Sequence, residues 1–215
     1  MTYPPTLGVI LAGGLARRMG GGDKGMHEVG GEPVLDRLIR ILQPQVSGLV
    51  LNANGDPARL AGPGLPIVPD TLPDRPGPLA GVAAGLDWAA AHAPGMDWPG
   101  MDWIVTVPWD CPFVPADLVA RLHAGRGTAD LACAASGGWT HPVVALWPLS
   151  LRDALRAAVQ DGTRKIDAFT ARYTMARVEW PTDPVDPFFN VNTPEDLAEA
   201  NRLAPSAPSP SGVKP

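Results

Sequence analysis

Cysteine is scarce in this sequence. Among its 215 residues only Cys111 and Cys133 carry thiols, and they stand too far apart to form a CxxC pair. The pattern therefore predicts neither a disulfide framework nor a zinc site of the usual spacing. Because free thiols persist best in a reducing compartment, we expect a cytoplasmic protein.

Long apolar runs and an excess of basic residues are also missing. No stretch approaches the roughly 20 apolar residues needed to cross a bilayer, and Met1–Thr6 lack the cationic start of a secretory signal. The formal net charge of -5 and the pI of about 5.3 argue against a surface that coats nucleic acid. We therefore expect neither a membrane nor a nucleic acid as partner. The negative net charge does not argue against a small anionic ligand, because a few cations in one cleft are enough to bind it.

The sequence does have enough apolar residues for one core. Hydrophobic residues make up 45% and charged residues 18%, which is ordinary globular composition. The length is within the range that a single core supports. We predict one domain over residues 1–203, followed by a disordered Pro/Ser-rich tail over residues 204–215.

Short apolar runs alternate with segments of helical periodicity. We expect strands over 6–11, 49–51, 65–68 and 103–107, with helices that begin near Pro33 and Pro78 between them. Such alternation predicts an α/β fold built from parallel βαβ units. In the second half we expect strands over 131–134, 143–147 and about 175–180, and helices over about 115–122, 152–159, 166–173 and 194–203.

A glycine-rich loop, Leu11 to Lys24, follows the first expected strand directly. Five of its fourteen residues are glycine, so backbone N–H groups can approach an anion closely. Arg17, Arg18 and Lys24 make the loop locally cationic. Open α/β sheets bind ligands at the carboxyl ends of their strands, so the loop is a candidate triphosphate site. It matches neither GxxxxGK[ST] nor GxGxxG, and a flexible solvated loop is the alternative interpretation.

This loop, written LAGG-x-x-x-RMGG-x-DK, resembles the signature of the molybdenum cofactor guanylyltransferases. The resemblance runs over about residues 6–203 and includes five further segments in order: Asn52-Ala53-Asn54, Pro69-Asp70, Gly77-Pro78-Leu79-Ala80-Gly81, Pro108-Trp109-Asp110-Cys111-Pro112 and Asn190-Val191-Asn192-Thr193-Pro194-Glu195-Asp196. It implies a three-layer Rossmann-like nucleotidyltransferase fold with a mostly parallel central sheet. It also implies transfer of GMP from GTP to molybdopterin, or to its molybdenum-loaded form, with Mg²⁺ as cofactor.

Three residues are candidates for catalysis. Lys24 can act on the phosphates as a compact charge, and Arg18 can add a fork-like contact. Asp110 follows the fourth expected strand, where a carboxylate can hold Mg²⁺ against substrate phosphates or simply cap a turn. The resemblance favours the metal role, since the matching family aspartate contacts magnesium and nucleotide. This sequence departs from the family pattern at Cys111, where the family usually has Thr. Trp109 is a candidate for stacking on a flat ring.

Asn52 and Asp70 are candidates for binding the nucleotide. Each ends an expected strand on the same sheet edge as the loop, and an amide and a carboxylate can read a base or a ribose. Either can equally cap a turn. The resemblance implies nucleotide binding for both, and for the backbone of Leu11, Ala12, Gly13 and Gly14. The choice of guanine over cytosine also rests on the resemblance.

Asn190 and Asn192 are candidates for binding the acceptor. They flank one apolar residue, so both side chains face one way in an extended segment. The family motif suggests that they grip the pterin or its phosphate, while a hydrogen-bonded strand-to-helix turn is the alternative. Arg164, Lys165 and His141 are weaker candidates whose roles stay open.

Two other functions stay open. One is a nucleotidyltransferase with another base or acceptor, such as the cytidylyl version of the cofactor or a sugar 1-phosphate. The other is a non-catalytic nucleotide-binding regulator. The resemblance further implies, as partners, proteins that hand over or receive the labile cofactor, such as a molybdenum insertase and molybdoenzyme-specific chaperones. The oligomeric state is not predicted.

Overall fold

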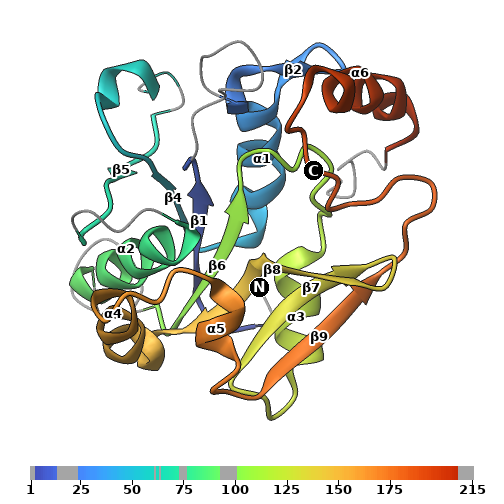
Figure 1. Ribbon diagram of the computed structural model, residues 1–215. Coiled ribbons are helices and arrows are strands. Elements are labelled where there is room, and N and C mark those ends of the chain that lie inside the picture. Colours follow the sequence, from blue (N-terminus) through green and yellow to red (C-terminus); the bar gives the residue numbers. More distant parts are fainter. Residues whose placement is uncertain are drawn as a thin grey trace.

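The computed structural model describes residues 3–13, 24–60, 62, 64–72, 77–92 and 101–207, with only the backbone described for Lys24. A central sheet lies between two layers of helices (Figure 1). The seven strands follow the spatial order β5-β4-β1-β6-β8-β7-β9. Their bounds are β1 (Thr6–Leu11), β4 (Gly48–Asn52), β5 (Ile67–Val68), β6 (Trp103–Pro108), β7 (Leu131–Ser136), β8 (Trp139–Pro148) and β9 (Met175–Trp180).

The expected parallel pairing is confirmed for the first four of these strands. β1 pairs in parallel with both β4 and β6, and β4 pairs in parallel with β5. β8 is the exception, because it runs antiparallel to both β6 and β7. Gly137 and Gly138 join β7 to β8 with φ angles of 54° and 86°. A two-residue turn with two positive φ angles can only return the chain as an antiparallel neighbour. β7 and β9 pair in parallel at the edge.

Two buried clusters fill the spaces between the sheet and the helices. Helices α1 (Val34–Leu42), α3 (Leu118–Arg126) and α6 (Pro194–Leu203) lie on one face, and α2 (Pro78–Ala91), α4 (Arg152–Gln160) and α5 (Ile166–Thr170) on the other. Along β1, Val9 and Leu11 face the α2 side while Ile10 faces the α1 side. Burial on both faces explains the unbroken apolar run that predicted this strand.

Some element boundaries differ from the expectation. α3 begins at Leu118 rather than near Pro115, because residues 115–118 first form a turn in which the Leu118 N–H donates to the Pro115 carbonyl at 3.2 Å. A short antiparallel pair, β2 (Glu28–Val29) and β3 (Glu32–Pro33), was not predicted. The short 3-10 helices are η2 (Lys24–Met26), η3 (Gln43–Gln45), η4 (Pro57–Leu60), η5 (Leu149–Leu151) and η6 (Ala204–Ser206). η6 falls within the segment that the sequence marks as a disordered tail.

The strand order places a crevice at the middle of the sheet. From β1 the chain moves outward to β4 and β5, and then returns to β6 on the other side of β1. Open α/β sheets bind ligands beyond the carboxyl ends of their strands at such a reversal. Among the residues described, no helix combines the length and the apolarity that crossing a bilayer requires.

Candidate active site

The carboxyl ends of the three central strands lie side by side. Leu11, the last residue of β1, is in register with Asn52 of β4 and with Pro108 of β6. The pairing continues past the strands, since the Ala12 N–H donates to the Asn52 carbonyl at 2.8 Å and the Trp109 N–H donates to the Leu11 carbonyl at 3.2 Å. The start of the glycine-rich loop is therefore held between the segments that carry Asn52 and Asp110.

One cavity of about 440 Å³ opens at this edge, between the ends of β1 and β4 and the start of α2. We call it the nucleotide-side cavity. Its lining residues are Leu11, Gly13, Asn52, Ala53, Asn54, Asp70, Gly77, Pro78, Gly81, Pro108 and Val143. Four of the predicted nucleotide-binding residues are thus brought together. The first turn of α2 forms part of the wall, where the positive end of the helix dipole favours an anion.

Asp70 is held by two asparagine side chains in this cavity. Asn52 Nδ2 donates to Asp70 Oδ1 at 3.0 Å and to the Val68 carbonyl at 3.0 Å. Asn54 Nδ2 donates to Asp70 Oδ2 at 2.8 Å, while the Asp70 N–H donates to Asn54 Oδ1 at 2.9 Å. The carboxylate is fixed in orientation, and each oxygen retains a lone pair for a ligand. Sequence reasoning did not single out Asn54, although its spacing of two from Asn52 was a usable signal.

Gly81 lets α2 approach the strand ends closely. A Cβ at Gly81 would stand 2.4 Å from Asn52 Oδ1 and 2.8 Å from Leu11 Cδ2, so a side chain fits there only if these groups or the helix move. The helix therefore packs directly against Asn52, and its first turn reaches the cavity.

A second cavity, of about 340 Å³, adjoins the first. We call it the acceptor-side cavity. It is lined by Pro108, Asp110, Cys111, Thr140, His141, Pro142, Val143, Val144, Asn190 and Asn192, and it shares Pro108 and Val143 with the nucleotide-side cavity. Asp110, Asn190 and Asn192 are thus brought together, with Val191 between the asparagines buried at 2% exposure.

The segment that carries the two asparagines is fixed at both ends. The Val191 N–H donates to the Asp110 carbonyl at 2.8 Å. Asp196 Oδ2, which accepts from the Thr193 N–H in the capping box of α6, also accepts from the Asn192 N–H at 2.9 Å. The Cys111 thiol donates to Asn190 Oδ1 at 3.1 Å. Burial, together with the charges of Asp110 and Asp186, raises the pKa of Cys111, so the thiol keeps the proton that it donates.

Gly25, the residue after the glycine-rich loop, packs against Trp109, the residue before Asp110. Gly14 and Arg18 lie outside the described residues, and Lys24 enters only through its backbone, as the first residue of η2. A Cβ at Gly25 would stand 2.7 Å from Trp109 Cε3, so Gly25 rests on the indole ring. Lys24 precedes Gly25 and Asp110 follows Trp109. Trp109 is 1% exposed, and the stacking role considered for it is wrong because its ring is covered by the core.

Of the three weaker candidates, His141, Arg164 and Lys165, only His141 lines a cavity of the site. His141 lines the acceptor-side cavity. Arg164 and Lys165 are exposed and line neither cavity. The Arg164 carbonyl stands 3.5 Å from where a Cβ at Gly77 would be, which places its backbone near the nucleotide-side cavity.

Asp110 contributes the one Asp or Glu carboxylate among the lining residues of the acceptor-side cavity. Among the described residues, no group of three or more His, Cys, Asp or Glu side chains is arranged to hold a metal ion. Mg²⁺ is usually bound by one or two carboxylates together with substrate phosphates. The donors in the described part of the chain therefore fit a divalent ion held jointly by protein and nucleotide, rather than a metal enclosed by protein ligands alone.

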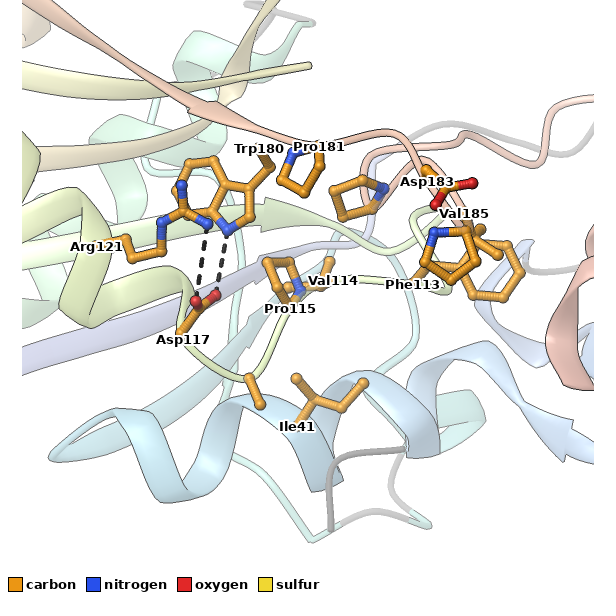
Figure 2. A pocket seen from close by; sticks show the side chains of 13 residues that line it. Ile41, Phe113, Val114, Pro115, Asp117, Arg121, Trp180, Pro181, Asp183 and Val185 are labelled. Carbon is orange, nitrogen blue, oxygen red and sulfur yellow. Dashed lines mark hydrogen bonds and ion pairs between the residues drawn. The ribbon is translucent and has the colours of Figure 1, made fainter. Parts of the chain in front are cut away.

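A third cavity, of about 450 Å³, lies apart from this chemistry (Figure 2). None of the predicted site residues lines it. Three of its lining residues interact with one another, since Asp117 accepts from Trp180 Nε1 at 3.1 Å and pairs with Arg121 at 3.8 Å, and Arg121 lies over the Trp180 ring. Asp117, Arg121 and Trp180 therefore take part in packing α3 against β9.

Comparison with known proteins gives consistent matches. The family model described as a MobA-like NTP transferase domain matches residues 8–177. A protein of Nitrobacter hamburgensis named molybdenum cofactor guanylyltransferase is 57% identical over 204 residues, covering 94% of this chain and 95% of the relative. A protein of Rhodopseudomonas palustris with the same name is 58% identical over 205 residues, covering 94% and 95%.

The solved structures agree on the fold. Molybdopterin-guanine dinucleotide biosynthesis protein A from Archaeoglobus fulgidus superposes with a TM-score of 0.72 at 23% identity, covering 94% of this chain and 99% of that one. The 2-C-methyl-D-erythritol 4-phosphate cytidylyltransferase from Thermus thermophilus gives 0.63 at 18% identity, covering 94% and 100%. At these identities the two solved structures support the fold alone.

Proposed function

The chain belongs to the MobA-like NTP transferase family, and from this premise we propose how it acts as a molybdenum cofactor guanylyltransferase. The enzyme transfers GMP from GTP to molybdopterin, or to its molybdenum-loaded form, giving the molybdopterin guanine dinucleotide and pyrophosphate. Close relatives that carry this name over nearly the whole chain support the assignment.

One observation supports the proposal most strongly. The nucleotide-side and acceptor-side cavities share Pro108 and Val143 and meet at the end of β6. A transfer between two substrates requires that both be bound next to each other, with the reacting atoms in near contact. Two adjoining cavities at the ligand-binding edge of the sheet provide such an arrangement.

We assign the nucleotide to the cavity that contains Asn52 and Asp70. The Asp70 carboxylate, held by Asn52 and Asn54, would accept hydrogen bonds from the base or the ribose. The backbone of residues 11–14 and the cations Arg18 and Lys24 would bind the triphosphate. We assign the acceptor to the cavity of Asn190 and Asn192.

The reaction itself is a displacement at phosphorus. A phosphate oxygen of the acceptor forms a bond to the α-phosphorus of GTP, and the bond from that phosphorus to the β-phosphate bridging oxygen breaks. Pyrophosphate leaves with the electron pair. Asp110 would hold Mg²⁺, which offsets the negative charge gathered by two anionic substrates. Lys24 and Arg18 would stabilise the charge that the leaving group develops.

Cofactor formation by the purified protein tests this function. GTP, Mg²⁺ and molybdopterin together should give the dinucleotide and one equivalent of pyrophosphate, and omission of molybdopterin should abolish pyrophosphate release. CTP in place of GTP separates the guanylyl from the cytidylyl reaction. Nucleotide binding without pyrophosphate release would instead identify a non-catalytic regulator.

We also propose a cellular compartment and partner proteins for this reaction. Cys111 and Cys133 are both buried and free, which supports work in the reducing cytoplasm. Because molybdopterin is labile, we propose direct exchange with a molybdenum insertase and with molybdoenzyme-specific chaperones.

A further inference from the structure

His141 is linked by hydrogen bonds to Ser136 and, through it, to Asp186, and the proposed reaction gives neither residue a role. Ser136 Oγ lies 2.8 Å from His141 Nε2 and 2.8 Å from Asp186 Oδ1. Ser136 closes β7 and is 1% exposed, whereas His141 lies on β8 and lines the acceptor-side cavity beside Asp110 and Asn190. The three side chains thus form a line from the Asp186 carboxylate to the cavity wall.

The protons in this line have one consistent arrangement. An ionised carboxylate only accepts hydrogen bonds, so the single Ser136 hydroxyl proton points to Asp186. Ser136 Oγ must then accept from His141, which requires a proton on Nε2. In the neutral ring the other nitrogen, Nδ1, is left as a hydrogen-bond acceptor.

Packing fixes the position of this ring. His141 lies with its centroid 4.8 Å from that of Phe188, and Asp186 Oδ1 also accepts from the Phe188 N–H at 3.0 Å. Burial lowers the pKa of His141; the charge of Arg177 acts in the same direction, while Asp186 and Glu179 oppose it. The ring is therefore neutral near pH 7, with Nδ1 as its hydrogen-bond acceptor.

We propose that His141, held in its Nε2–H form by Ser136 and Asp186, binds the heterocycle of the acceptor by accepting a hydrogen bond through Nδ1 from a ring N–H or an amino group. This inference rests on the proposed function, because it concerns the acceptor of that reaction. A pterin carries N–H donors of this kind. A phosphate group at pH 7 offers chiefly acceptor oxygens, which a bare ring nitrogen does not attract. His141 therefore selects the pterin end of the acceptor, and Ser136 and Asp186 are positioning residues.

Steady-state kinetics test the contact. In His141→Phe the KM for molybdopterin should rise about tenfold, as for the loss of one buried hydrogen bond, while the KM for GTP changes less than twofold. His141→Asn, which can place an amide oxygen near the Nδ1 position, should recover part of this loss. His92→Asn is the matched control, because His92 caps the far end of α2 and stacks on Trp88. An unchanged molybdopterin KM in His141→Phe, or an equal rise for GTP, would overturn the inference.

Nitrogen-15 NMR of the four histidines tests the proton arrangement without any substrate. The signals lost in His141→Asn should show a protonated Nε2 and a bare Nδ1. Ser136→Ala should shift His141 toward the other tautomer, while Asp186→Asn, which keeps an acceptor for Phe188, should do so less. A wild-type ring protonated at Nδ1 overturns the inference. Failure of the wild-type protein to form cofactor refutes the proposed function instead, so the two failures are distinguishable.

Discussion

In the proposed function, the Lys24 side chain contributes a positive charge to triphosphate binding. Lys24→Ala would remove this cation from the phosphates, so we expect kcat to fall by the equivalent of about 3 kcal/mol of transition-state stabilisation. Lys24→Arg keeps the charge with a different shape and should lose less. Arg172→Ala, an exposed cation before β9 at the opposite end of the sheet, serves as the control. Undiminished turnover of Lys24→Ala, measured as pyrophosphate release, would contradict the role.

The proposed role of Asp110, binding of Mg²⁺, can be tested by removing its charge. Asp110→Asn keeps the shape but removes the charge that a divalent ion needs, so we expect weaker turnover and a higher Mg²⁺ requirement. The fold should be intact, because the contact that ties this segment to Val191 comes from the Asp110 backbone carbonyl. A magnesium titration of the rate, with circular dichroism of both proteins, is the measurement. Asp153→Asn, on the exposed side of α4, is the control. An unaltered magnesium dependence would remove Asp110 from the site.

At the scale of elements, the contact of α2 with the strand ends determines the shape of the nucleotide-side cavity. Gly81→Ala would place a methyl group 2.4 Å from Asn52 Oδ1, so the helix or the amide must move. Overpacking of this kind destabilises by about 1–3 kcal/mol, although alanine is favoured over glycine in a helix by nearly 1 kcal/mol. We expect a net loss of stability in urea unfolding, and a rise in the KM for GTP.

Gly62→Ala is the matched control for that variant. A Cβ at Gly62 meets nothing within 4 Å, so stability and GTP binding should stay near the wild-type values. If Gly81→Ala proves as stable as the wild type and binds GTP equally well, the close approach of α2 does not shape the cavity.

At the scale of the whole molecule, the packing of His123 links stability to pH. His123 on α3 stacks on Tyr3, and its Nε2 lies 2.8 Å from Thr6 Oγ1. Burial, with a smaller effect of the Arg126 charge, lowers the pKa of His123 to about 4. The unfolded chain, with a pKa near 6.5, therefore binds this proton more readily than the folded one.

The contribution of neutral His123 to the free energy of unfolding should therefore be fully present above pH 6.5. It should fall as the pH drops from about 6.5 toward 4. We expect the decline in unfolding free energy between pH 7 and pH 5 to be smaller in His123→Gln, which can still donate to Thr6 but does not titrate. Urea unfolding of both proteins at the two pH values measures this. Parallel declines in the two proteins would exclude His123 as the source.

Local patterns in the sequence were enough for most of the elements. The apolar run of β1 gave its bounds, Thr6–Leu11, and the Thr193-Pro194-Glu195-Asp196 cap gave the start of α6. These signals are local because an apolar period or a cap involves residues within a turn or two of each other. The glycine-rich loop and the segments that follow the strands also indicated the family. The reversed strand β8 and the burial of Trp109 were not predicted, since both depend on packing partners distant in sequence.

The amino-acid sequence by itself determined the elements, the parallel half of the sheet and the residue types at the carboxyl ends of its strands. Only the tertiary structure decided which of those residues meet. Cys111 and Asn190 are 79 positions apart, and the Ser136–His141–Asp186 line joins β7, β8 and the loop after β9. Their meeting follows from strand order and helix packing, which arise from burial summed over the whole core. No short stretch of sequence carries that information.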